Sequence, residues 1–273
     1  IVCLYLLQCL LVSKYASDIK EGAMIKEYYN SEKNHDVLIL GDCEVYENIS
    51  TVTMWENYGI SSYIRGSAEQ LIWQSYYLLE DTLKYEKPQV VIVNVLAMTE
   101  SDAKNEAYNR MTLDGMKLSK YKIASIRESM TEEENMASYI FPLLRYHSRW
   151  SELSSEDFRY MWKTPSVTTN GYLMQKGVRP VKTIPKAAPL ANYTFSDRNM
   201  EYLDKIYSLC KDNGINLVLM KAPSVYPHWY DEWDKQVSDY AYEHGILYLN
   251  TINEAGNIGI DYTTDTFDYG QKL

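Results

Sequence analysis

Cysteine is scarce in this sequence, and the positions of its four cysteines exclude two kinds of site. Cys3 and Cys9 lie in an apolar segment at the start, and Cys210 lies in a stretch with helical character. Cys43 is in a turn. Because no Cys-x-x-Cys pair occurs, the sequence predicts neither a disulfide framework nor a cysteine-ligated metal site.

A surplus of basic residues is also missing. The 273 residues carry 27 Lys and Arg against 37 Asp and Glu, a net charge of -10, and no basic run occurs. Binding to nucleic acid depends on clustered cations that contact phosphates, so we expect no nucleic-acid partner. The length suits one large domain, or one domain that carries a long insertion.

No apolar run is long enough to cross a bilayer. Residues 1–12 (IVCLYLLQCLLV) are apolar except for Gln8. Twelve helical residues extend about 18 Å, against a hydrocarbon core of about 30 Å. We interpret residues 1–13 as the end of a truncated transmembrane anchor or signal segment, and 14–273 as the folded domain. The following SKYASDIKEG has no clear small-residue cleavage site, which favours an uncleaved anchor over a signal peptide or a buried core helix.

Apolar segments typical of buried strands alternate with helical segments along the chain. This alternation predicts an α/β fold, a flavodoxin-like three-layer α/β/α arrangement with a five-stranded, mainly parallel sheet. Ligands bind such sheets beyond the carboxyl ends of the strands. The expected strands are 36–42, 61–66, 89–96, 215–223 and 246–251.

Residues 97–195 break the alternation. About a hundred residues are too many for a plain loop, and the segment contains both helical stretches and a part rich in Gly and Pro. We expect an insertion that packs over the carboxyl edge of the sheet.

A small turn, Gly41-Asp42-Cys43, follows the first expected strand. A tight strand-to-helix turn exposes its side chain beside backbone N–H groups, where a nucleophile and part of an oxyanion hole belong. Gly66 follows the second strand, Asn94 follows the third, and the tail reads DTFDYGQKL. In these four blocks the chain resembles the SGNH/GDSL hydrolase superfamily over residues 36–96 and 197–273.

The resemblance implies a role for each matching position. Cys43 is expected to be the acyl-accepting nucleophile, in place of the usual Ser. The backbone N–H groups of Cys43 and Gly66 and the side chain of Asn94 are expected to hold the oxyanion. Asp265 or Asp268 is expected to orient the base. The resemblance implies no metal and no organic cofactor.

The nucleophile and the base both depart from the superfamily pattern. Thiolates attack acyl carbons well, and a helix N-terminus is expected to lower the pKa of Cys43; the alternative is a buried thiol without function. The expected His is replaced by Lys272 or Gln271, depending on the alignment. A charged Lys272 cannot accept a proton but can stabilise an oxyanion, so we expect an electrostatic helper.

The four histidines offer alternative bases. His228 follows the fourth strand, on the edge where ligands are expected, and is the first alternative. His147 lies in the insertion. His35 precedes the first strand, on the opposite edge, and His244 ends a helix.

A closer likeness connects the chain with membrane-anchored members of the superfamily that resemble DltD and the alginate acetylation proteins. It implies an extracytoplasmic hydrolase or acyltransferase of the bacterial cell envelope that acts on ester-linked acyl groups of glycans. Its partners would be such a glycan or a small acyl ester, the membrane, and a membrane-bound acyltransferase. The alternative is a non-catalytic glycan-binding or scaffolding protein. A cytosolic flavodoxin-like module is disfavoured, because no phosphate-cradling loop follows the first strand.

Overall fold

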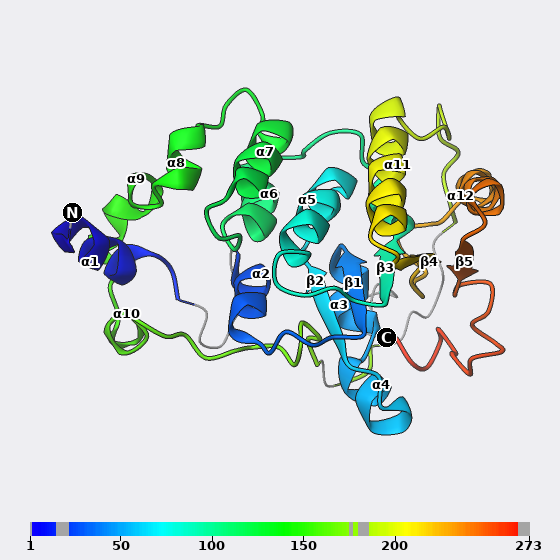
Figure 1. Ribbon diagram of the computed structural model, residues 1–273, viewed down its shortest axis with the longest axis horizontal. Coiled ribbons are helices and arrows are strands. Elements are labelled where there is room, and N and C mark those ends of the chain that lie inside the picture. Colours follow the sequence, from blue (N-terminus) through cyan, green and yellow to red (C-terminus); the bar gives the residue numbers. More distant parts are fainter. Residues whose placement is uncertain (1, 15–21, 175–176, 180–185, 267–273) are drawn as a thin grey trace.

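A parallel sheet forms the centre of the molecule (Figure 1). The computed structural model describes residues 2–14, 22–174, 177–179 and 186–266. Its five strands lie in the order β2-β1-β3-β4-β5, and every neighbouring pair is parallel. All five predicted strands are confirmed. They are β1 (Val37–Gly41), β2 (Ser62–Gly66), β3 (Val90–Asn94), β4 (Asn216–Lys221) and β5 (Leu247–Asn250).

Helices cover both faces of this sheet, as predicted. Helices α5 (Ile72–Thr82), α11 (Asp197–Asp212) and α12 (Asp231–His244) bury their apolar sides in the larger core, with Leu40 and Val93 of the sheet. Helices α3 (Cys43–Asn48) and α4 (Thr51–Tyr58) follow β1 on the other face, where a smaller core contains Ile39 and Ile64. Strands β1 and β2 are buried along their whole length because both faces are covered.

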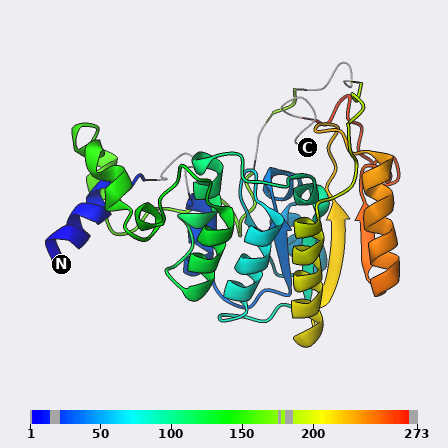
Figure 2. The ribbon, with the colours of Figure 1, turned by 90° about the horizontal axis from the view of Figure 1, so that it is seen from above.

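Most of the insertion extends sideways from the sheet, so the expectation that it covers the carboxyl edge is wrong for its helices (Figures 1 and 2). Helix α7 packs beside α5, since its apolar residues complete the larger core. Residues 188–193 do reach the start of α12, where the Tyr230 hydroxyl donates to the Ala188 carbonyl at 2.5 Å. The short η2 (Val95–Thr99) leads from β3 into the insertion. The helices of the insertion that lie away from the carboxyl edge are α6 (Glu106–Leu113), α7 (Lys120–Ser129), α8 (Met136–Ile140), α9 (Leu143–Tyr146), η3 (His147–Ser151) and α10 (Ser155–Arg159).

The start of the chain lies far from the sheet. Helix α1 (Val2–Leu11) packs against α9, η3 and α10, and leaves most of its apolar side chains exposed. Helix α2 (Ala23–Glu27) and η1 (Tyr28–Asn30) return the chain to the core. Within the described ranges, no helix is both long and apolar enough to cross a membrane. The interpretation of residues 1–13 as an anchor stays a prediction.

Candidate active site

Cys43 is the first residue of α3, at the point where β1 ends at the carboxyl edge of the sheet. The Asp42 side chain caps the helix, because its Oδ1 accepts from the Glu44 backbone N–H at 3.1 Å. Cys43 is partly buried and packs against the smaller core. The tight strand-to-helix turn predicted from Gly-Asp-Cys is therefore present.

Gly41, Gly66 and Asn94 converge at this turn, as the register requires. Gly41 is paired with Gly66 across β1 and β2, and Leu40 is paired with Val93, which places Asn94 beside Gly41. A Cβ atom on Gly41 would lie 2.7 Å from the Asn94 Cβ, and one on Gly66 would lie 3.0 Å from the Gly41 carbonyl oxygen. Glycine is needed at both positions because the backbones and Asn94 approach so closely.

A buried ion pair lies directly behind the turn. The Lys221 ammonium, at the end of β4, contacts both carboxylate oxygens of Glu44 at 2.8 Å. The Ser224 hydroxyl donates to Glu44 Oε1 at 2.6 Å and accepts from Lys221 at 3.0 Å. Lys221 also donates to the Ala222 carbonyl at 2.8 Å. Each group in the cluster is buried, and the hydrogen bonds satisfy charges that would otherwise be costly to bury.

Asn94 connects this cluster to the turn. Its amide nitrogen donates to Asp42 Oδ1 at 3.0 Å and to Glu44 Oε2 at 2.9 Å. Its amide oxygen accepts from the Ala222 backbone N–H at 3.0 Å. Both ends of the amide are thus occupied by protein groups, so stabilising an oxyanion through Asn94 would require one of these bonds to open.

The acidic surroundings act against ionisation of the thiol. Burial raises the pKa of Cys43, and the charges of Asp42, Glu47 and Glu44 raise it further. This is opposite to the pKa-lowering effect expected from a helix N-terminus. Helix α3 has only six residues, so its small dipole does not offset burial and the acidic side chains near the thiol.

Asp42 also titrates abnormally. Burial, followed by the nearby charge of Glu44, raises the pKa of Asp42 to about 8, although Lys221 acts in the opposite direction. Lys221 pairs with Glu44, so the buried Asp42 keeps its proton at neutral pH and bears the charge that raises the pKa of Cys43 only above about pH 8.

His228 lies in the loop that follows β4, as predicted. It is exposed, and its ring packs edge-on against Tyr230 with 4.6 Å between the centroids. The same loop touches α3, because the Asn48 side chain donates to the Pro223 carbonyl at 3.0 Å. His228 therefore lies on a loop that borders the Cys43 helix. Among the described residues, no contact joins its ring to Cys43.

The other histidines have structural surroundings. His35 is buried with Glu86, 2.9 Å from its carboxylate, on the edge opposite the turn. His244 stacks on Tyr240 and its Nδ1 lies 2.8 Å from the Tyr240 carbonyl. His147 is exposed in η3.

Only part of the predicted tail can be placed. Asp265 is exposed and stabilises a local turn, since its Oδ2 accepts from the Asp261 backbone N–H at 2.8 Å. Asp268, Gln271 and Lys272 lie outside the described residues. The proposed contributions of Asp268 and Lys272 stay predictions.

The Glu44–Lys221–Ser224 cluster was not predicted from the sequence. A signal was present in the sequence, because Lys221 ends an otherwise apolar strand, NLVLMK. A buried lysine requires a carboxylate partner. The partner could not be identified from the sequence, since Glu44 is 177 residues away and is one of 37 Asp and Glu residues.

Two cavities of the described structure lie away from the Cys43 turn. One has a volume of about 470 Å³ and is lined by α1, α2 and residues 160–165, and the other, of about 260 Å³, lies beside Tyr63 and Asn170. Neither is lined by Cys43, Gly66 or Asn94.

No protein-family model and no curated protein matches this chain. Several solved structures are similar to it, including two from Bacteroides species. A Bacteroides fragilis protein described as an acylhydrolase is 10% identical, with 82% of this chain and 71% of that chain covered and a TM-score of 0.36. A GDSL-like lipase of Bacteroides thetaiotaomicron is 12% identical, with 84% and 78% covered and a TM-score of 0.36. The similarity is one of fold, and it assigns no substrate to this chain.

Proposed function

We propose that the chain is an SGNH/GDSL-type hydrolase or acyltransferase that acts on ester-linked acyl groups of cell-envelope glycans, with Cys43 as the acyl acceptor. The observation that carries the proposal is the position of Cys43 at the first turn of α3, two residues after Gly41, which is paired with Gly66 at the carboxyl edge. Nucleophiles of open α/β sheets act from this edge. The extracytoplasmic location and a membrane-bound acyltransferase partner belong to the same proposal, by analogy with the superfamily.

The charges around the thiol determine the reactivity that we expect. Because the pKa of Cys43 is raised, little thiolate exists at neutral pH. Acyl transfer to Cys43 then becomes faster as the pH rises, since only the thiolate attacks. Lys272 of the tail, kept charged by Asp265 or Asp268, would stabilise the oxyanion rather than remove the proton.

Acylation of the intact protein tests the proposal. The protein is incubated with a small acetyl ester at pH 7, 8 and 9, and the mass gained is located by peptide mapping. We expect one acetyl group on Cys43, formed about tenfold faster per pH unit, and none in Cys43→Ala. Cys210→Ala is the matched control, because Cys210 is a buried thiol in the core of α11. Acetylation that persists in Cys43→Ala, or is absent at pH 9, refutes Cys43 as the acceptor.

Turnover distinguishes hydrolysis from acceptance alone. We expect weak ester hydrolysis by the wild type and faster hydrolysis by Lys272→His, which restores the base of the superfamily. If the wild type is already fast and Lys272→His is no faster, another base acts, and His228→Ala is the variant that identifies it.

A non-catalytic role is supported by two observations. The carboxyl groups raise the pKa of the thiol, and the amide of Asn94 is fully occupied by Asp42, Glu44 and Ala222. For a glycan-binding protein we expect binding of acylated glycan fragments that is unchanged in Cys43→Ala, with no acetylation at any pH.

A further inference from the structure

Exposed apolar side chains are concentrated at one end of the molecule. Residues 2–14 and 136–163, here called the lobe, form α1, α8, α9, η3 and α10, which project away from the sheet (Figures 1 and 2). The lobe is about a sixth of the chain. It nevertheless provides ten of the 23 large hydrophobic side chains that are exposed among the described residues. They are Val2, Leu4, Tyr5, Leu6, Leu7, Phe141, Leu144, Trp150, Phe158 and Trp162.

The two segments of the lobe form one surface. Tyr5 of α1 and Trp162, which follows α10, pack with 6.5 Å between their ring centroids. Arg149 in η3 joins the segments, because it donates to the Leu11 carbonyl at 2.5 Å and to Asp157 at 3.1 Å. The exposed aromatic and aliphatic groups therefore belong to neighbouring elements, and a single partner can cover them.

The charge of the lobe differs from that of the rest of the chain. The whole chain has a net charge of -10, but the lobe carries five Lys and Arg against three Asp and Glu. Arg145 and Arg149 pair with acidic groups of the protein, whereas Arg159 and Lys163 are exposed and adjoin Phe158 and Trp162 in the sequence. Long cationic side chains beside Trp and Phe are typical of helices that lie in the interface of an anionic bilayer.

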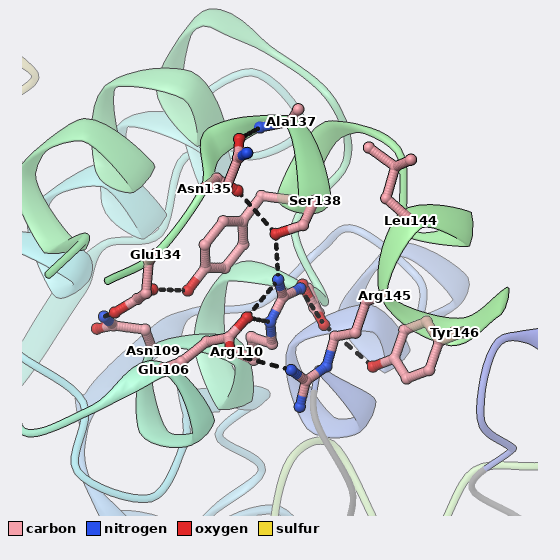
Figure 3. Close-up of polar contacts among 12 residues, drawn as sticks. Glu106, Asn109, Arg110, Glu134, Asn135, Ala137, Ser138, Leu144, Arg145 and Tyr146 are labelled. Carbon is pink, nitrogen blue, oxygen red and sulfur yellow. Dashed lines mark hydrogen bonds and ion pairs between the residues drawn. The ribbon is translucent and has the colours of Figure 1, made fainter. Parts of the chain in front are cut away.

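The lobe is held rigidly to the α/β body (Figure 3). Arg110 of α6 is fully buried and donates to Ser138 of α8 at 2.6 Å and to Asp114 at 2.9 Å. Its guanidinium lies 4.0 Å from the centre of the Tyr139 ring. A buried arginine with these partners fixes the orientation of α8 relative to α6.

A second contact fixes α9 on the same helix. Arg145 pairs with Glu106 of α6 at 3.1 Å, and the Tyr146 hydroxyl donates to Asp114 at 3.3 Å. Figure 3 shows the side chains of Arg145 and Tyr146 pointing toward α6, while that of Leu144 points away from it. The exposed side of the lobe consequently has a set orientation relative to the sheet.

We propose that the lobe is a membrane-binding surface, whose exposed aromatic and aliphatic groups enter the interface of an anionic lipid bilayer while the exposed Arg159 and Lys163 contact the headgroups. Burial of several Trp, Phe and Leu side chains supplies the affinity, and the cations favour anionic lipids. The body would then be held at the bilayer surface with a fixed orientation. This proposal depends on the lobe and not on Cys43, so acylation and membrane binding can fail independently.

Vesicle binding by the intact chain tests it. The protein is sedimented with vesicles of phosphatidylcholine, with and without phosphatidylglycerol. The test variant is Trp150→Ser with Phe158→Ser, whose side chains are 72% and 60% exposed. The matched control is Trp55→Ser with Tyr58→Ser on α4 of the body, 61% and 73% exposed. All four side chains are exposed, so we expect unchanged thermal unfolding in both variants.

We expect the wild type and the control to bind anionic vesicles equally, and the lobe variant to bind at least about tenfold more weakly. Arg159→Gln with Lys163→Gln should weaken binding about fivefold per charge on anionic vesicles and leave binding to neutral vesicles unchanged. Equal binding by the lobe variant and the wild type refutes the proposal, as does equal loss in both aromatic variants. The proposal is also refuted if the wild type does not bind vesicles but self-associates, and the lobe variant does not self-associate. That outcome assigns the surface to a second copy of the chain.

Discussion

Replacing Asp42 by Asn is expected to change how the stability of the protein depends on pH. Asn is an equally good helix N-cap, and its Oδ1 can still accept from the Glu44 N–H and from the Asn94 amide. The substitution therefore preserves the geometry of the turn. It removes only the proton that the buried carboxyl group binds and releases.

The magnitude follows from the raised pKa. In the native state the pKa of Asp42 is about 8, against 3.8 for an ordinary Asp. Between these values the native state binds more protons than the unfolded state, so the free energy of unfolding falls as the pH rises. At about 1.4 kcal/mol per pKa unit, the full loss between pH 4 and pH 8 is at most about 6 kcal/mol. Relaxation of the protein around the ionised Asp42 carboxylate lowers this loss, so we expect a loss of about 2–6 kcal/mol.

Urea unfolding followed by tryptophan fluorescence measures the effect at pH 5 and at pH 9. We expect Asp42→Asn and the wild type to differ by less than about 1 kcal/mol at pH 5, and the variant to be more stable by about 2 kcal/mol or more at pH 9. Glu56→Gln, which removes an exposed carboxylate from α4, is the control and should follow the wild type. Parallel pH profiles for Asp42→Asn and the wild type would show that Asp42 is ionised in the native state at neutral pH.

Three further changes test the same region. Lys221→Met should lower the free energy of unfolding by about 3–5 kcal/mol, because it leaves Glu44 buried without its cation. Lys221→Met combined with Glu44→Gln should lower the free energy of unfolding by less than Lys221→Met alone, and a larger loss would contradict the pairing. Gly41→Ala should cost about 1–3 kcal/mol in urea unfolding, since its Cβ would meet the Asn94 Cβ at 2.7 Å; Gly256→Ala, with open space around it, should cost little, and equal costs would exclude close packing at the turn. Alkylation of Cys43 by iodoacetamide at pH 7 should be at least about tenfold slower than that of a free cysteine, and an equal or faster rate would show that the carboxyl groups do not suppress the thiolate.

The course of the chain was predictable where local patterns are strong. The apolar segments that became β1 to β5 are buried on both faces, which makes them continuous in the sequence. Gly41, Gly66 and Asn94 could be placed together because parallel strands end at the same edge of a sheet. The Gly-Asp-Cys turn was predictable because Asp caps a helix that begins at the next residue.

The site chemistry and the shape of the insertion were not predictable in this way. The thiol pKa was expected to fall, but the structure brings Asp42, Glu44 and Glu47 close to Cys43, and their combined charge depends on which way α3 turns its side chains. The helices of the insertion were expected over the carboxyl edge. Helix α7 packs beside α5 instead, and α8 is held to α6 by the buried Arg110, whose partners in α8 lie 28 and 29 residues away.

The sequence by itself determined the strands, the parallel sheet and the edge at which Cys43 lies, because burial and turn geometry act between residues near one another in the chain. Only the tertiary structure decided the partners of the buried charges and the position of the exposed apolar lobe. Glu44 pairs with Lys221, which is 177 residues away in the sequence, and α1 contacts α10, which is also distant in the sequence. Coulombic and packing interactions of this kind depend on distance in space, which a linear pattern of residue types does not contain.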